Sequence, residues 1–239
     1  PLALVVSLVS YSVYIADSDR EEGELKTTHQ HNIAVASSSI YRSLSILKND
    51  LLYLAASEPL QLTLESHTAE NLAHLNKTFA LFSETKLDYD QIRWIDEKGL
   101  EQIRINLVDN KAVVVDDNLL QSKQDRYFFE ETMTMKRGEI YISPMDLNIE
   151  ANQITTPYKP TVRVSSPVFN IAGERKGIVI LNFLAQHLID HFIVAAGEIS
   201  SEIMIVDKNS YWLMHPDKTL EWGMMFDNGA SLAKHYPQS

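Results

Sequence analysis

The chain has 239 residues, a formal net charge of −11 and no cysteine. This length suits one large domain or one and a half ordinary ones, and the apolar fraction of 45% argues against disorder. Because nucleic-acid backbones are also anionic, the acidic charge excludes nucleic acid as an expected partner. The absence of cysteine excludes a disulfide scaffold and a cysteine-ligated zinc site.

The first 16 residues carry no charged side chain. A spanning helix needs about 20 apolar residues, so we interpret residues 1–16 as the trailing part of a transmembrane helix. Tyr11 and Tyr14 lie near its end, where an interfacial aromatic belt would place them. Arg20 is the only basic residue in the acidic stretch that follows, which favours a location outside the cytoplasm. A cleaved signal peptide and a buried core helix are the alternatives.

A long helical pattern follows. Apolar residues recur at alternating steps of four and three, at Ile40, Leu44, Leu47, Leu51 and Leu54. This is the spacing of a coiled-coil seam, and it predicts a stalk helix over residues 17–57 that ends before Pro59. The seam is expected to pack on the chain's own sheet, on a second copy in a homodimer, or on both.

A second helix is predicted from Thr68 to Phe82, and the pattern then changes to that of strands. Gln91 to Asp96 and Leu100 to Leu107 alternate apolar and polar residues, and Gly99 supplies the turn of a hairpin.

The rest of the chain continues this mixture of strands and helices. The predicted elements are a short strand at Ala112–Val115, a short helix at Asp125–Met135, a strand at Glu139–Ser143, a hairpin of Thr161–Phe169 and Gly177–Phe183 around Gly173, and a helix at Gln186–Ala196. Ser201–Asp207 and Tyr211–His215 then repeat the plan of the first hairpin, which predicts the start of a second copy of the module. Only about 39 residues remain there, so this copy is expected to be incomplete.

The order of these motifs resembles the double Cache sensors, the tandem PAS-like (PDC) periplasmic sensors of histidine kinases, GGDEF diguanylate cyclases and chemoreceptors. The segments that carry the resemblance are WIDEKGLEQIRIN, RYFFEET, GEIYISPMDLN, KPTVRVSSPVFN, GERKGIVILNF and, in the second copy, MHPDKTLEWG.

The resemblance implies an α+β fold in which a long N-terminal helix leads into a central antiparallel sheet of five or six strands flanked by helices. On this basis residues 58–197 form a membrane-distal module and residues 198–239 begin a membrane-proximal one. It further implies a periplasmic region of a protein of the bacterial inner membrane, bracketed by transmembrane helices. A small-molecule ligand, carboxylate or amino-acid-like, would bind between the sheet and the segments that cover it.

The candidate ligand-binding residues follow from the same resemblance. Amino-acid-binding Cache domains carry an arginine followed by aromatic residues where this chain has Arg126, Tyr127 and Phe128, although the usual tryptophan is absent. The family's tyrosine and aspartate on the next strand correspond best to Tyr141 and Asp146. The ligand class stays open because of the missing tryptophan.

Further candidates lie beside these positions. They are Ser143, Asn148 and Arg163. Alternatives remain for each: Arg126 could pair with Glu130 on one helical turn, the segment SPMDLN has the composition of a loop, and Arg163 and Arg93 could face either the pocket or solvent.

No catalytic motif is present in the sequence. The histidines are scattered, so no metal site is expected, and neither is a cofactor. The region is thus predicted to be a non-enzymatic ligand sensor, with any histidine kinase or diguanylate cyclase activity in a cytoplasmic domain of the parent protein. The alternative is a structural module that senses a periplasmic partner protein.

Overall fold

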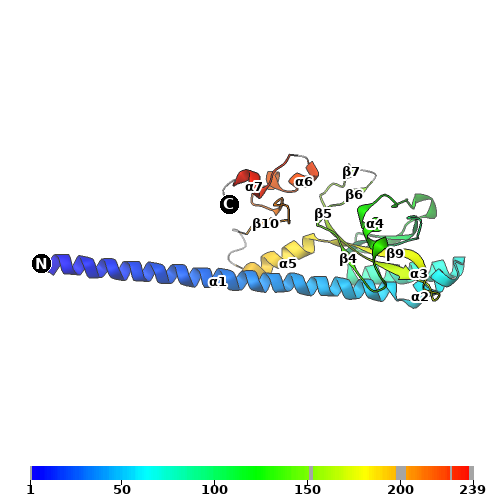
Figure 1. The fold of residues 1–239 in the computed structure, drawn as a ribbon, viewed down its shortest axis with the longest axis horizontal. Helices are drawn as coiled ribbons and strands as arrows, with labels where there is room; N and C mark the ends of the chain where they lie inside the picture. The colour runs from blue at the N-terminus through cyan, green and yellow to red at the C-terminus, as the bar shows by residue number, and fades with distance from the viewer. Residues whose placement is uncertain (1, 151–152, 198–202, 227, 237–239) are drawn as a thin grey trace.

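One helix of 54 residues, α1 (Leu2–Ala55), forms the shaft of the molecule (Figure 1). At about 1.5 Å per residue, it is about 80 Å long. The computed structural model describes the backbone of residues 2–150, 153–197, 203–226 and 228–236 and, within these ranges, the side chains from residue 26 onward except that of residue 150. No helix in the part of the chain so described is long and apolar enough to cross a membrane. The assignment of residues 1–16 to the membrane stays a prediction.

Two further helices complete the N-terminal part. α2 (Glu58–Glu65) begins with Pro59 in its first turn, so this proline starts a new helix as well as following the end of α1. Proline is tolerated there because the first-turn N–H groups have no partner within the helix. This short helix was not expected from the sequence. α3 (Ala69–Lys86) is capped by Thr68, whose hydroxyl accepts from the N–H of Asn71.

The sheet has the strand order β3-β2-β1-β9-β8-β4, and β5 also pairs with β8. Its strands are β1 (Tyr89–Ile95), β2 (Glu101–Val108), β3 (Lys111–Val114), β4 (Tyr141–Ile142), β5 (Asp146–Leu147), β8 (Pro160–Phe169) and β9 (Arg175–Leu184). All pairings are antiparallel. Both hairpins predicted for this sheet are thereby confirmed. The sheet has seven strands among the described residues, against the five or six expected, because two two-residue strands, β4 and β5, both pair with β8.

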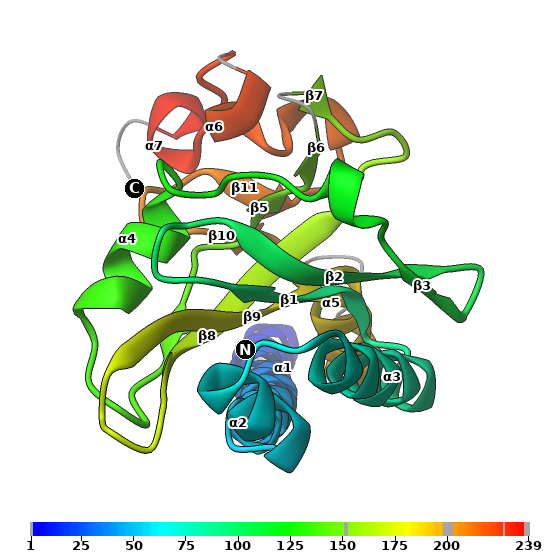
Figure 2. The same cartoon turned by 90° about the vertical axis from the view of Figure 1, so that its right-hand side faces the viewer.

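One face of the sheet is apolar and packs on the N-terminal helices. Figure 2 shows α1, α2 and α3 together beneath it. The helices contribute Leu47, Leu51, Leu54, Leu75 and Phe79 to this core, and the strands contribute Ile92, Trp94, Ile103, Ile105, Val162, Val164 and Leu181. The predicted seam of α1 thus packs at least partly on the chain's own sheet.

The other face is covered by the short segments between the two hairpins. These are the 3₁₀ turn η1 (Asp117–Leu119), the helix α4 (Tyr127–Thr134) and the small hairpin of β6 (Ile149–Glu150) and β7 (Gln153–Ile154). In Figure 2 they lie on the side of the sheet opposite α1. The sheet therefore has two covered faces, and all seven residues of β1 are buried.

The C-terminal part returns along the shaft. α5 (Gln186–Ala196) runs beside α1, and its Phe192 and Ala196 pack with Ala36. β10 (Ile205–Val206) and β11 (Trp212–Met214) form the hairpin that was predicted to begin the second module. Ser201 and Glu202, at the start of that prediction, lie outside the described residues. The turn η3 (Lys218–Leu220) and the short helices α6 (Gly223–Phe226) and α7 (Leu232–His235) follow.

Candidate ligand-binding site

The covered second face of the sheet is rich in buried polar side chains. Strand pairing places residues that lie opposite each other on the same face: Gln91 opposite Asn106 and Asn182, and Arg163 opposite Asn182. The polar side chains of this face that are at most 7% exposed are Gln91, Arg93, Glu101, Arg104, Thr161, Arg163, Ser165 and Asn182. This face therefore differs from an ordinary apolar core. Its buried polar groups need hydrogen-bond or charge partners, because burial without a partner costs free energy.

Three predicted site residues meet on this polar face. Nη1 of Arg163, on β8, lies 2.5 Å from Oδ1 of Asp146, on β5. The Tyr127 hydroxyl donates to Oδ2 of Asp146 at 3.1 Å and accepts from Nη1 of Arg163 at 3.3 Å. The three side chains come from α4, β5 and β8, so only the tertiary fold brings them together. Arg163 faces this cluster rather than solvent.

The cluster keeps Arg163 charged and Tyr127 protonated. Burial acts to lower the pKa of Arg163, but the charge of Asp146 and the contact with Tyr127 outweigh it and raise that pKa. Burial raises the pKa of the Tyr127 hydroxyl, although Arg163 opposes the shift. Tyr127 remains 36% exposed, so its ring lies at the edge of the cluster.

Ser143 and Tyr141 border the same cluster. The Ser143 hydroxyl accepts from the N–H of Arg163 at 2.9 Å and donates to the carbonyl of Pro144 at 2.7 Å, which extends the pairing of this segment with β8. The Tyr141 ring meets the Tyr127 ring edge-on at 6.5 Å between centroids. Burial raises the pKa of Tyr141 as well.

Arg126 and Phe128 lie at the start of α4. The guanidinium of Arg126 stands over the Phe128 ring at 5.6 Å from its centroid, and that of Arg163 stands at 5.8 Å from the same centroid. Within the described residues, the Arg126 guanidinium forms no ion pair with Glu130 or any other carboxylate. Phe128 is 2% exposed, so the ring that both cations approach is itself buried.

Asn148 is buried but belongs to a different neighbourhood. It lines a cavity of about 320 Å³ that also involves Gln91, Arg104 and Asn106. Its main chain binds the facing segment, because its N–H donates to the carbonyl of Lys159 and its carbonyl accepts from the N–H of Thr155. The predicted loop SPMDLN is partly strand, since it contains β5.

The sequence did not identify the polar residues of β1 and β2 as site residues. Arg93 was left undecided between pocket and solvent, and the structure buries it. Glu101 is the centre of this group, with its carboxylate 3.2 Å from Nε of Arg93, 2.9 Å from Nη1 of Arg104 and 3.9 Å from Nζ of Lys123. The sequence does show these residues as the polar positions of the alternating segments QIRWI and EQIRIN. In a sheet covered on only one side such positions would face water, so the pattern did not indicate a site.

No metal centre emerges from the described part of the chain: it contains no group of three or more histidine, aspartate or glutamate side chains arranged to hold an ion. The groups that the polar face offers are cations, carboxylates, hydroxyls and amides. Such groups bind and orient a polar small molecule.

Solved structures of known proteins share this fold. The domain of a sensory box/GGDEF family protein from Vibrio parahaemolyticus has a TM-score of 0.78 at 19% identity, covering 89% of this chain and 82% of its own. The extracellular domain described as that of the histidine kinase vpHK1S-Z8 has a TM-score of 0.77 at 19% identity, covering 89% and 77%. The ligand-binding domain of the Pseudomonas fluorescens chemoreceptor CtaA, in complex with L-serine, has a TM-score of 0.55 at 16% identity, covering 86% and 75%. Among curated proteins no match was found.

The family comparison covers most of the chain. The model described as the sensor domain of bacterial histidine kinases matches residues 29–239. The match therefore includes the shaft from residue 29, the whole sheet and the β10–β11 hairpin. The chain belongs to the family of bacterial histidine kinase sensor domains.

Proposed function

We propose that this sensor domain binds a small carboxylate or amino-acid-like ligand on the polar face of its sheet. The observation that carries the proposal is the cluster of Arg163, Asp146 and Tyr127, with the Arg126 guanidinium unpaired beside it among the described residues. A planar guanidinium binds a carboxylate in two parallel hydrogen bonds. Arg126 supplies that group, and the rings of Phe128, Tyr127 and Tyr141 enclose the apolar part of the ligand.

The remaining members of the site orient the ligand. Asp146 accepts a hydrogen bond from an ammonium or hydroxyl group of the ligand, which replaces the bond that Tyr127 donates to it. The hydrogen bond from the N–H of Arg163 to the Ser143 hydroxyl holds the chain before β5 against β8. The chemoreceptor domains of the same fold have been solved with L-serine and with L-norvaline, which favours a ligand of amino-acid size.

A route from the site to the second module runs through β5. Asp146 belongs to the ligand cluster, whereas the next residue, Leu147, is fully buried against Leu213 and Trp222 of the C-terminal segment. A ligand that displaces Asp146 would therefore shift the packing of the second module. Ligand binding would thus shift the population between two arrangements of the second module. The shaft helices α1 and α5 would transmit this shift along the molecule.

The parent protein supplies the rest of the pathway. We infer that flanking transmembrane helices anchor the region in the inner membrane, with the sensor in the periplasm and a cytoplasmic histidine kinase or diguanylate cyclase as output. A homodimer through α1 would bring two copies of the output domain together. Residues Tyr41 and Tyr53 of α1 are more than 60% exposed and offer apolar surface for that contact.

The experiment is a thermal-shift screen of metabolites followed by calorimetric titration of the hits. Arg126→Ala is expected to weaken binding of a hit by about 2–5 kcal/mol, because it leaves the ligand carboxylate without its partner. Its effect on stability is expected to stay below about 1 kcal/mol, because the half-buried Arg126 forms no ion pair with a carboxylate of the described residues.

Arg137→Ala is the matched control. Arg137 also stands over an aromatic ring, that of Phe169 at 4.9 Å, but lies outside the cluster. Unchanged affinity in Arg126→Ala would remove this residue from the site. If no metabolite class stabilised the domain, the alternative of a periplasmic partner protein would gain support.

A further inference from the structure

A second polar cavity lies on the same face of the sheet, away from the Arg163 cluster. Its volume is about 320 Å³. It is lined by Asp90, Gln91, Arg104, Asn106, Asn148 and Lys159, together with Leu107, Val108 and Thr155. Its floor is β1 and β2, and its outer wall is formed by Asn148 and by the covering segment from Gln153 to Lys159, which contributes Thr155 and Lys159. None of the residues of the Arg163 cluster contributes to it.

Two buried atoms of this cavity wall have no partner. Arg104 is 7% exposed; its Nη1 binds Glu101 and its Nη2 donates to the carbonyl of Leu119 at 3.0 Å. The Nε–H of Arg104 and Oδ1 of Asn106 are buried and have no hydrogen-bond partner among the described residues. One is a donor attached to a cation and the other is an acceptor, so a ligand must present both kinds of group to satisfy them.

The rim carries a cation that can also reach a ligand. Nζ of Lys159 lies 2.7 Å from Oδ1 of Asp90, and its side chain is 41% exposed. None of the nine lining residues is aromatic, which disfavours sugars and other ligands that bind by stacking. A volume at the lower end of the usual range for ligand pockets limits the occupant to a small metabolite.

We propose that this cavity is a second ligand site, for a small carboxylate with a neighbouring hydroxyl or ammonium group. The carboxylate accepts from Nε–H of Arg104 and from Lys159, and the adjacent donor binds Oδ1 of Asn106. Charge-assisted bonds to a buried guanidinium are strong because the surroundings compete little for it.

The site would also hold the covering segment in place. Lys159 follows Tyr158, whose ring contacts that of Phe226 in the second module at 5.3 Å between centroids. A ligand bound between β2 and Lys159 therefore fixes a segment that contacts both modules. This gives the second site its own route to the C-terminal half, distinct from that through Leu147.

The test is calorimetric titration of the whole chain with L-malate and L-serine, and with succinate as the probe that lacks the adjacent donor. We expect L-malate or L-serine to bind and succinate to bind more weakly. Asn106→Leu keeps the side-chain size and removes the acceptor, and it is expected to weaken binding about tenfold, the loss that follows from one or two hydrogen bonds. Lys159→Met is expected to weaken binding about fivefold, as for a partly exposed charge.

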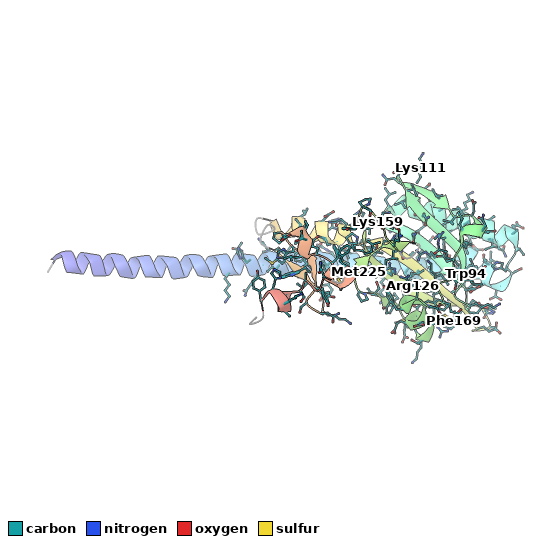
Figure 3. All side chains as sticks on the ribbon, turned by 90° about the horizontal axis from the view of Figure 1, so that it is seen from above. Trp94, Lys111, Arg126, Lys159, Phe169 and Met225 are labelled. Carbon is teal, nitrogen blue, oxygen red and sulfur yellow. The ribbon has the colours of Figure 1, made fainter. Side chains whose placement is uncertain are left out.

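Two control variants separate this site from the first. Lys111→Met changes an exposed lysine at the edge of the sheet, apart from Lys159 (Figure 3), and is expected to leave the affinity unchanged. Arg126→Ala is expected to remove only the binding at the first site and to leave a second binding event with unchanged affinity, because Arg126 does not line the cavity. The proposal is overturned if neither L-malate nor L-serine binds, if Asn106→Leu binds like the wild type, or if Arg126→Ala alone abolishes binding. The last result would leave the first site standing without the second.

Discussion

The two faces of the central sheet are both buried but differ in what buries them. The face toward α1 and α3 is closed by aliphatic and aromatic side chains such as Leu51, Phe79 and Ile92, each fully buried. The face toward α4 buries a smaller apolar cluster of Ile95, Ile178 and Ile180 with Phe128 and Phe129, but it also buries charged and amide groups, among them Arg163 and Glu101. Successive side chains of a strand point to opposite faces of the sheet, so the two faces differ in chemistry because alternate residues of each strand differ. One phase of the alternation builds the main apolar core, and the other combines a smaller apolar cluster under α4 with buried polar groups.

The chemistry of the two faces has different consequences for stability. Apolar contacts gain free energy in proportion to the area they remove from water. A buried ion pair must first overcome the loss of hydration of both partners, and replacing it with apolar groups is often neutral or stabilising. The charges of the polar face therefore contribute less net stability than their number suggests. Binding, rather than folding, is the reason we give for their presence.

The largest effect is expected when the carboxylate of Glu101 is removed from the polar face. Glu101→Gln takes away a carboxylate whose side chain is fully buried and which faces Arg93, Arg104 and Lys123. We expect a loss of about 3–5 kcal/mol in the free energy of unfolding, because breaking a buried pair leaves charge uncompensated. Urea denaturation measures it. A loss below about 1 kcal/mol, typical of surface pairs, would show that water reaches this cluster.

On the apolar face, Leu51→Ala tests the packing of the shaft on the sheet. Leu51 is fully buried in the main core. We expect a loss of about 2–5 kcal/mol, from the lost transfer free energy and the cavity left behind. Ile46→Ala is the matched control on the same helix, since Ile46 is 53% exposed and should change stability by less than about 0.5 kcal/mol. Similar losses for both variants would contradict the packing described for α1.

A smaller effect is expected where the shaft meets the sheet through a polar contact. The Tyr89 hydroxyl donates to Oδ2 of Asp50 on α1 at 2.6 Å, and Lys86 pairs with Oδ1 of the same carboxylate at 2.9 Å. Tyr89→Phe removes one partner of a buried carboxylate, which should cost about 1–3 kcal/mol. Lys86 continues to pair with Asp50, so the lower end of this range is expected.

The same contact gives a pH dependence. Burial raises the pKa of Tyr89, and the hydrogen bond to Asp50 and the charges of Asp50 and Asp88 raise it further. The folded state thus keeps this proton more tightly than the unfolded chain, so the stability that depends on it is complete below about pH 10, the ordinary tyrosine pKa, and is lost as the pH rises above it. Urea titrations on both sides of that pH should show a steeper alkaline loss in the wild type than in Tyr89→Phe. Equal slopes would contradict the assignment.

Most of the elements could be predicted from the sequence. The seam from Ile40 to Leu54, the hairpin turn at Gly99 and the hairpin around Gly173 are local patterns, and the structure contains each of them. The helix α5 begins and ends at the predicted residues. The short helix α2 escaped prediction, because a proline that ends one helix gives no sign of starting the next.

The candidate site could be predicted only in part. Tyr127 and Asp146 were expected on the basis of a family resemblance, and Arg163 was a candidate that could face either the pocket or solvent. The three lie within hydrogen-bonding distance of one another. Asn148 was grouped with them but lines the second cavity. That Arg104 and Asn106 line a cavity could not be predicted, because an alternating strand has the same sequence whether its polar residues face water or a buried pocket.

The sequence by itself determined the order of helices and strands, the acidic character of the chain and the family to which it is similar, since each of these depends on local patterns along the chain. Tertiary structure alone decided which polar side chains are buried and which of them meet. The physical reason is that α4 and the segment from Gln153 to Lys159 cover the sheet, although they are distant in sequence from the strands β1 and β2. Burial and partnership of a charge depend on that cover, and nothing in the strand's own residues encodes it.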